Sequence, residues 1–134
     1  MAGKSFKVAI NPTFKATVEI PMVGGNPLRV GFTFKAMGRR DLARLFDKWK
    51  DENVALAKEA EQRKEEGNPL SLEEWADREI ALQVTQVKDI VLGWGFAEEF
   101  NDENIEALVE TSVSVTDVII EQYNEGYRRA REGN

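Results

Sequence analysis

The sequence predicts an α+β fold in which helices dominate, with an N-terminal antiparallel β-hairpin of two to three strands packed on a bundle of about four helices. In the first 36 residues, the apolar side chains fall on even positions, the spacing of strands with one buried face. From residue 39 onward, apolar residues recur instead at the spacing of amphipathic helices. The 134 residues are expected to form a single domain, 1–134, that buries a core without cross-links.

The β-hairpin region is predicted over residues 5–36. A short arm, Phe6–Ile10, is followed by the turn signal Asn11-Pro12, then by strands over about 13–22 and 28–35. The loop Gly24-Gly25-Asn26-Pro27 joins the two strands. Because a lone hairpin is marginal in water, its apolar face needs cover from a helix or another chain. The even-numbered apolar residues are Phe6, Val8, Ile10, Phe14, Ala16, Val18, Ile20, Met22, Leu28, Val30, Phe32 and Phe34.

A sheet of this kind leaves at least one edge strand without a neighbour. Such an edge is a natural site for strand addition by another chain. The arm, set apart by Asn11-Pro12, is the segment best placed to exchange between copies.

A long helix is predicted over 39–66. Leu42, Leu45, Phe46 and Trp49 form a buried stripe, whereas charged residues dominate after Lys50. A helix of this length spans about 40 Å, so its distal half is expected to project or to pack on a neighbouring subunit. The helix should end at Gly67-Asn68-Pro69.

The next helix, 71–92, has the clearest start signal in the chain. Ser71 and Glu74 form a capping box, and Leu70 and Trp75 occupy the positions of a hydrophobic staple. Trp75 is therefore predicted to lie in the core. Gly93-Trp94-Gly95 is expected to end the helix as a loop.

Residues 101–131 are predicted to form the C-terminal helices. Asn101 is the expected cap of a short helix that ends near Glu110. Ser114 is the expected cap of the last helix, whose inner face carries Tyr123 and Tyr127.

The absence of histidine and cysteine closes most nucleophilic, general-base and transition-metal chemistry. No catalytic residue, cofactor or metal ligand is predicted, so the chain is not expected to be an enzyme. The acidic residues Glu98, Glu99, Asp102 and Glu103 fit a favourable charge at a helix N-terminus better than a cation site.

The net charge of −6 argues against a nucleic-acid partner, since an acidic surface repels phosphate. The sequence shows neither a long apolar span nor a secretory leader, so no membrane partner is expected. The chain is instead expected to work by contact with other polypeptides.

Three places are candidate partner-binding sites. Trp94 stands between glycines that leave its ring little backbone cover, and Trp49 is a second aromatic anchor. Gly24, Gly25, Asn26 and Pro27 form a loop tip that can carry contacts.

Several segments together resemble the tail assembly chaperones of long-tailed, lambda-like (non-contractile) bacteriophages and prophages. The resemblance covers most of the chain, and its most specific part is a Trp followed by a Phe-x-x-Glu-Asn-(Leu/Ile) helix start. The segments are Val30–Lys35, the helix with Leu42, Leu45 and Trp49, Val87–Trp94, Trp94 with Phe100–Leu108, and a closing helix like Val115–Tyr127.

The resemblance implies a non-catalytic chaperone that binds the phage tape measure protein and promotes assembly of the tail tube, as an oligomer. A longer product of a ribosomal frameshift would contact the tail tube protein. Such a protein acts in the host cytoplasm and is absent from the mature virion. Two alternatives stay open: a structural tail or virion component that is retained in the particle, and a small enzyme that uses only carboxylates or tyrosine.

Overall fold

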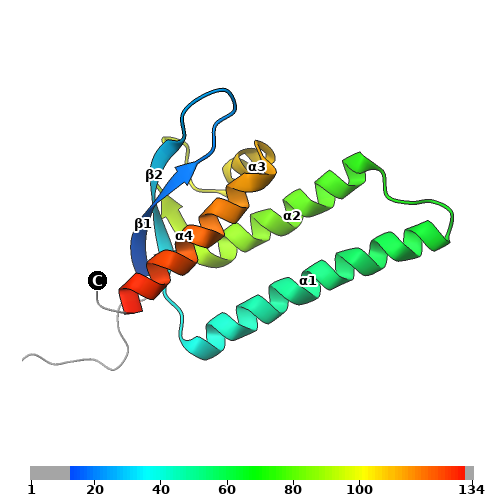
Figure 1. Cartoon of the computed structure of the whole chain (residues 1–134), viewed down its shortest axis with the longest axis horizontal. Helices are drawn as coiled ribbons and strands as arrows, with labels where there is room; N and C mark the ends of the chain where they lie inside the picture. The colour runs from blue at the N-terminus through cyan, green and yellow to red at the C-terminus, as the bar shows by residue number, and fades with distance from the viewer. Residues whose placement is uncertain (1–12, 132–134) are drawn as a thin grey trace, which may run out of the picture.

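A computed structural model of the chain describes residues 13–131, which form a three-stranded antiparallel sheet and four helices (Figure 1). The α+β, helix-dominated fold class is thus confirmed. In chain order the elements are β1 (Thr13–Ile20), β2 (Leu28–Lys35), α1 (Arg39–Glu65), α2 (Leu72–Ile90), β3 (Val91–Trp94), α3 (Asp102–Glu110) and α4 (Val113–Arg131).

The β1–β2 hairpin follows the even-numbered pattern of the sequence. Its register joins Phe14 to Phe34 and Val18 to Val30, so even positions face even positions. Opposed residues share a face, and this face is buried from Val18 to Ile20 and along β2. The odd-numbered residues of β1 are exposed to solvent.

The β-hairpin tip, residues 22–28, departs from that pattern. Met22 and Leu28 are 50% and 45% exposed although both have even numbers. They lie at or beyond the last cross-strand pair, where Gly24 adopts φ +74° and Gly25 N–H bonds to the Met22 carbonyl at 3.4 Å. A positive φ at this turn position favours glycine.

The third strand is not the one that the sequence suggested. The arm Phe6–Ile10 and the turn Asn11-Pro12 lie outside the described residues. Instead β3 pairs with β2, placing Trp94 opposite Phe32 with a bulge beside Thr33. The prediction that the helix runs to residue 92 and ends in a loop is wrong, because Val91–Trp94 completes the free edge of β2, a tertiary contact that outweighs helical periodicity.

Helix α4 covers the apolar face of the hairpin (Figure 1). Gly126 allows the close approach: a Cβ atom built there would lie 2.8 Å from Phe14 Cε2 and 3.3 Å from the Ala16 Cβ. The Tyr127 hydroxyl donates a hydrogen bond to the Met37 carbonyl, which ties the end of α4 to the β2–α1 connection.

Helices α1 and α2 form an antiparallel helical hairpin that extends away from the sheet (Figure 1). Helix α1 ends in a Schellman motif: Asn68 N–H bonds to the Arg63 carbonyl at 2.9 Å, Gly67 N–H bonds to the Lys64 carbonyl at 3.1 Å, and Gly67 adopts φ +77°. Both hydrogen bonds of the predicted Ser71–Glu74 capping box are present.

The two short-range predictions for the C-terminal helices have different outcomes. The Asn101 side chain accepts a hydrogen bond from Asn104 N–H at 2.9 Å, which confirms the cap of α3. The predicted cap at Ser114 is wrong, because α4 already begins at Val113 and the Ser112 hydroxyl accepts from Ser114 N–H at 3.2 Å. Ser112 offers the same hydroxyl chemistry two residues earlier.

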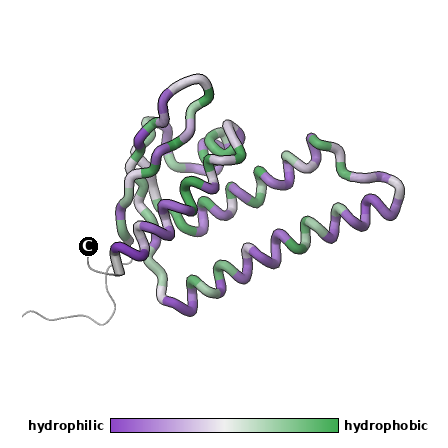
Figure 2. The backbone as a smooth tube through the Cα atoms, viewed as in Figure 1, coloured by the Kyte–Doolittle hydropathy of each residue, from purple (hydrophilic) through white to green (hydrophobic). Residues whose placement is uncertain are grey.

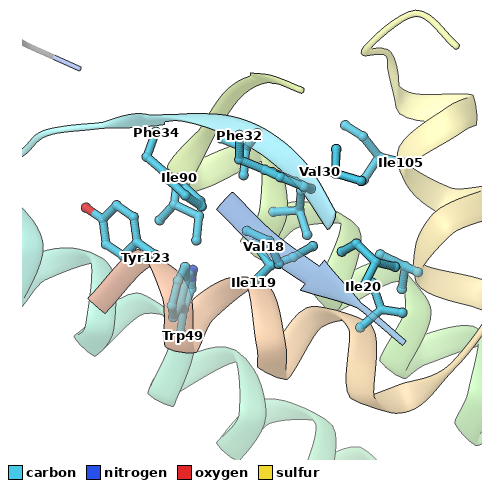
Figure 3. Packing of buried hydrophobic residues seen from close by; sticks show 14 residues of the cluster. Val18, Ile20, Val30, Phe32, Phe34, Trp49, Ile90, Ile105, Ile119 and Tyr123 are labelled. Atoms are coloured by element: carbon cyan, nitrogen blue, oxygen red, sulfur yellow. The ribbon is translucent and has the colours of Figure 1, made fainter. Parts of the chain in front are cut away.

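The hydrophobic core lies between the even-numbered face of the sheet and helices α2, α3 and α4 (Figure 3). Helix α1 contributes one buried residue, Trp49, from its proximal half. The distal half of α1 adds none of its described side chains to the core, and Figure 2 shows that this helix is largely hydrophilic along its length.

Candidate partner-binding surfaces

The proximal half of α1 is fixed to α2 by one cluster of contacts. The Trp49 side chain is 7% exposed, and its Nε1–H donates to Asp89 Oδ2 at 2.8 Å. Lys48 Nζ lies 3.0 Å from the same oxygen. Because the indole N–H and the carboxylate satisfy each other, the ring can be buried without an unpaired polar atom.

The distal half is joined across the helical hairpin by ion pairs. Arg78 on α2 holds Glu59 on α1 in a two-point contact, Nε to Oε1 at 2.8 Å and Nη2 to Oε2 at 2.9 Å. Arg63 reaches Glu74 at 3.2 Å. The hydrogen bond from Arg78 lowers the pKa of Glu59, and the Ser71 N–H together with Arg63 lowers the pKa of Glu74. Both carboxylates are therefore charged at neutral pH.

Between these polar links, two grooves open on the helical hairpin. Leu56 of α1 and Leu82 of α2 line both, and we call these two shared leucines the groove floor. We call the groove of about 460 Å³ that also includes Trp75 and Ile120 the α1–α2–α4 groove. Polar side chains make up about half of its lining: Asn53, Gln83, Gln86 and the acidic Glu79 and Asp117. An apolar floor with acidic edges suits an amphipathic helix that carries basic flanks.

The structure places the predicted site residues in different surroundings. Trp49 lies in the core between α1 and α2, about as far from solvent as the other core residues (Figure 3). Trp75, predicted as core, is half-buried and lines the α1–α2–α4 groove. The structure therefore offers the ring of Trp75, and not that of Trp49, to a ligand in this groove.

Trp94 is half-buried at the end of β3. Its ring meets Phe32, Phe96 and Phe100 edge to face, with centroids 5.0 to 6.3 Å apart. Its Nε1–H donates to the Glu98 carbonyl at 2.8 Å. Because the flanking glycines have no side chains, the three phenylalanines are what shields the Trp94 ring from solvent. The ring therefore stabilises the turn before α3.

The loop Gly24-Gly25-Asn26-Pro27 is exposed throughout. Val23 beside it is 92% exposed, and Met22 and Leu28 flank it with half of their surface open. The β-hairpin tip is thus an apolar projection, a feature typical of contact sites. Sequence reasoning selected the glycines and missed these apolar neighbours, because even-numbered Met22 and Leu28 matched the buried face.

Sequence reasoning also missed the groove. The sequence signal for the groove was Leu56, which lies seven residues after Trp49 and hence on the same side of α1. The partner on α2, Leu82, belongs to another helix, and only the packing of the two helices brings these leucines together. The partner-binding roles of Trp49, Trp94 and the Gly24–Pro27 loop stay predictions.

Within residues 13–131, no group of three or more acidic side chains is arranged to hold a metal ion. None of the helices in that part of the chain is long and apolar enough to cross a membrane.

A family model described as "Phage tail assembly chaperone" matches residues 1–134. No curated protein and no solved structure matches the chain.

Proposed function

The chain belongs to the phage tail assembly chaperones, and from that premise we propose that it binds the tape measure protein and promotes assembly of the tail tube around it. It acts without catalysis and as an oligomer. Membership in this family confirms the resemblance seen in the sequence.

The observation that carries the proposal is the α1–α2–α4 groove. A tape measure protein offers long helices whose apolar stripes aggregate when they are exposed. The floor of the groove, Leu56 and Leu82, together with Trp75 and Ile120, provides an apolar strip for one such stripe. Burying it there removes apolar surface from water, worth about 25 cal/mol per Å².

The charge of the helical hairpin supports the same role. Glu79 and Asp117 line the groove, and both are exposed. Acidic edges attract basic residues that flank an apolar stripe. A net charge of −6 also makes chaperone molecules repel one another, which opposes non-specific aggregation.

The remaining parts of the role concern the assembly as a whole. The tail tube protein is a second partner, reached through a frameshifted longer product. The chaperone works in the host cytoplasm and leaves before the virion is complete. Mass spectrometry of purified particles tests this: the chain should be absent, and its presence in stoichiometric amount would identify a structural tail component instead.

The groove is tested by co-expression of the tagged chain with the tape measure protein encoded near it. Leu82→Glu puts a charge on the groove floor and should reduce the co-purified tape measure protein at least about tenfold. Leu72→Glu is the matched control, since Leu72 lies on the same helix, is 88% exposed and does not line the groove. It should retain full binding.

Thermal unfolding of both variants separates binding from folding, because only variants with native melting curves count. If folded Leu82→Glu retains the tape measure protein as well as the Leu72→Glu control does, the groove is not the binding site. If the unmodified chain retains none, the partner itself is wrong.

A further inference from the structure

Within residues 13–131, no strand pairs with the outer edge of β1. Among residues 13–131, β2 is the neighbouring strand of β1, and no other described segment donates backbone hydrogen bonds to it. Alternate residues of an edge strand point their N–H and C=O groups away from the sheet. Helix α4 packs on the apolar side chains of β1, Phe14 and Ala16 among them. The edge can therefore take one more strand.

The arm that precedes β1 has the pattern of such a strand. Phe6, Val8 and Ile10 alternate with Lys7 and Ala9, as apolar and polar residues alternate along β1 itself. Five residues of strand span roughly 17 Å, enough to pair with five of the eight residues of β1. On the β1 edge, the apolar residues of the arm would extend the buried face of the sheet by one strand.

A hairpin within one chain would place those apolar residues on the wrong face. Asn11-Pro12 leaves two residues between Ile10 and Thr13, so a tight hairpin pairs position 10 with 13, 8 with 15 and 6 with 17. Opposed residues share a face, and Lys15 and Thr17 are exposed. The apolar side chains of the arm would then lie in solvent.

A longer loop within one chain does not solve this problem. For the even-numbered residues of the arm to pair with even-numbered residues of β1, Ile10 would have to pair with Phe14 or a later residue. Thr13 would then belong to the loop. Thr13 is extended and opposite Lys35 in β1. A second copy of the chain has no such constraint, because no loop joins its arm to the β1 edge that it meets.

Charge favours one register for the second copy. Residues 1–12 contain two lysines and no carboxylate, a charge of +2. Because the whole chain has a net charge of −6, residues 13–134 carry −8. In an antiparallel register with Lys7 opposite the exposed Glu19, the pair lies on the solvent face. The same register puts Phe6 opposite Ile20 and Val8 opposite Val18, both of which face the core.

We propose that the arm of one copy, Phe6–Ile10, adds as an antiparallel strand to the open β1 edge of a second copy, with Lys7 opposite Glu19. The inference rests on the self-association proposed above and names the surface responsible for it. Repeated from copy to copy, the contact forms either a closed dimer by mutual exchange or an open chain of subunits.

Cysteine cross-linking tests the register, since the natural chain contains no cysteine. Two single variants, Lys7→Cys and Glu19→Cys, are mixed and oxidised. The mixture should form covalent dimers of the two variants, because opposed residues of an antiparallel pair have Cβ atoms about 5 Å apart. Lys7→Cys mixed with Lys15→Cys is the matched control, because the proposed register puts Lys15 four residues from the position of Glu19.

Cross-linking as strong in the control as in the Glu19→Cys mixture, or none in either, overturns the register. A single chain that carries both Lys7→Cys and Glu19→Cys adds a second check. Disulfides between copies support the proposal, whereas a disulfide closed within one monomer shows that the arm pairs with its own chain and contradicts it.

Sedimentation velocity of the full chain tests the arm independently. Val8→Pro removes an N–H group and a buried side chain from the added strand, and should weaken self-association about tenfold or more. Ala2→Pro, outside the strand, should leave it unchanged. A chain that stays monomeric at all concentrations, or that associates equally well with Val8→Pro, overturns the proposal. Neither result bears on tape measure binding at the α1–α2–α4 groove, which the co-expression experiment measures separately.

Discussion

At the residue scale, Gly126 shows how one side chain controls the fit of a helix to a sheet. The Cβ of Gly126→Ala would lie 2.8 Å from a Phe14 ring atom, and that ring is held by Phe34, Tyr123 and Tyr127 at centroid distances of 5.4 to 6.1 Å. Overpacking of this kind costs about 1–3 kcal/mol and exceeds the helix-propensity gain of about 1 kcal/mol. Urea unfolding should show a net loss of stability, while Asn124→Ala, exposed on the same helix, should show none.

The two tyrosines of α4 are expected to affect stability differently when each is replaced by phenylalanine. The Tyr123 hydroxyl is buried with no hydrogen-bond partner in the described part of the chain, and burial raises its pKa to about 12. Tyr123→Phe should therefore leave stability unchanged or raise it by up to about 1–2 kcal/mol. Tyr127→Phe, which loses the bond to the Met37 carbonyl, should cost about 1 kcal/mol. Thermal unfolding of the two variants measures both, and equal losses would contradict the assignment.

At the element scale, the helical hairpin is held by polar contacts more than by a core of its own. Trp49 is the buried residue that α1 supplies, and beyond it the links across the hairpin are the pairs Arg78–Glu59 and Arg63–Glu74. The side chains of these pairs keep 22 to 39% of their surface exposed, and ion pairs so close to solvent add little to stability. The distal part of α1 should therefore be the first described segment to open, which suits a surface that receives a partner helix.

The titration of Glu59 tests that view. The hydrogen bond from Arg78 lowers its pKa below the ordinary 4.5, so this contribution to stability is complete above pH 4.5 and is lost as the pH falls through the lower, folded-state pKa. NMR titration of the Glu59 carboxyl carbon should show an apparent pKa below 4.5. Arg78→Gln should move it back toward 4.5, whereas Arg44→Gln, whose partner is Asp41, should not. An unchanged value in Arg78→Gln would show that the pair does not form in solution.

Three helix boundaries marked by local capping or stop motifs were predicted correctly from the sequence. The Ser71–Glu74 box, the Asn101 cap and the stop at Gly67 depend on residues within five positions of one another, and local chemistry is sufficient to place them. Strand β3 could not be found that way. Its residues continue the helical periodicity of α2, and its hydrogen-bond partner, β2, lies about sixty residues earlier in the chain.

At the scale of the whole molecule, three of the exposed large apolar side chains, Met22, Val23 and Leu28, gather at the β-hairpin tip. Val23→Asp at the tip should change stability by less than about 0.5 kcal/mol, since the side chain is 92% exposed. If the tip contacts a tail protein, the same variant should weaken retention of that protein in the co-expression assay. Val113→Asp, at a valine that is 76% exposed elsewhere, is the control. Equal retention by both variants would remove the tip from the binding surface.

Side-chain periodicity and short motifs in the sequence were sufficient to predict the fold class, the apolar face of the first hairpin and the family. Tertiary structure alone decided which side chains share a surface. It buried Trp49 against Asp89, gave Trp94 its aromatic neighbours, and brought Leu56 and Leu82 to one groove floor. The physical reason is that periodicity specifies which face of an element is apolar, whereas the partner of that face depends on packing between segments far apart in the chain.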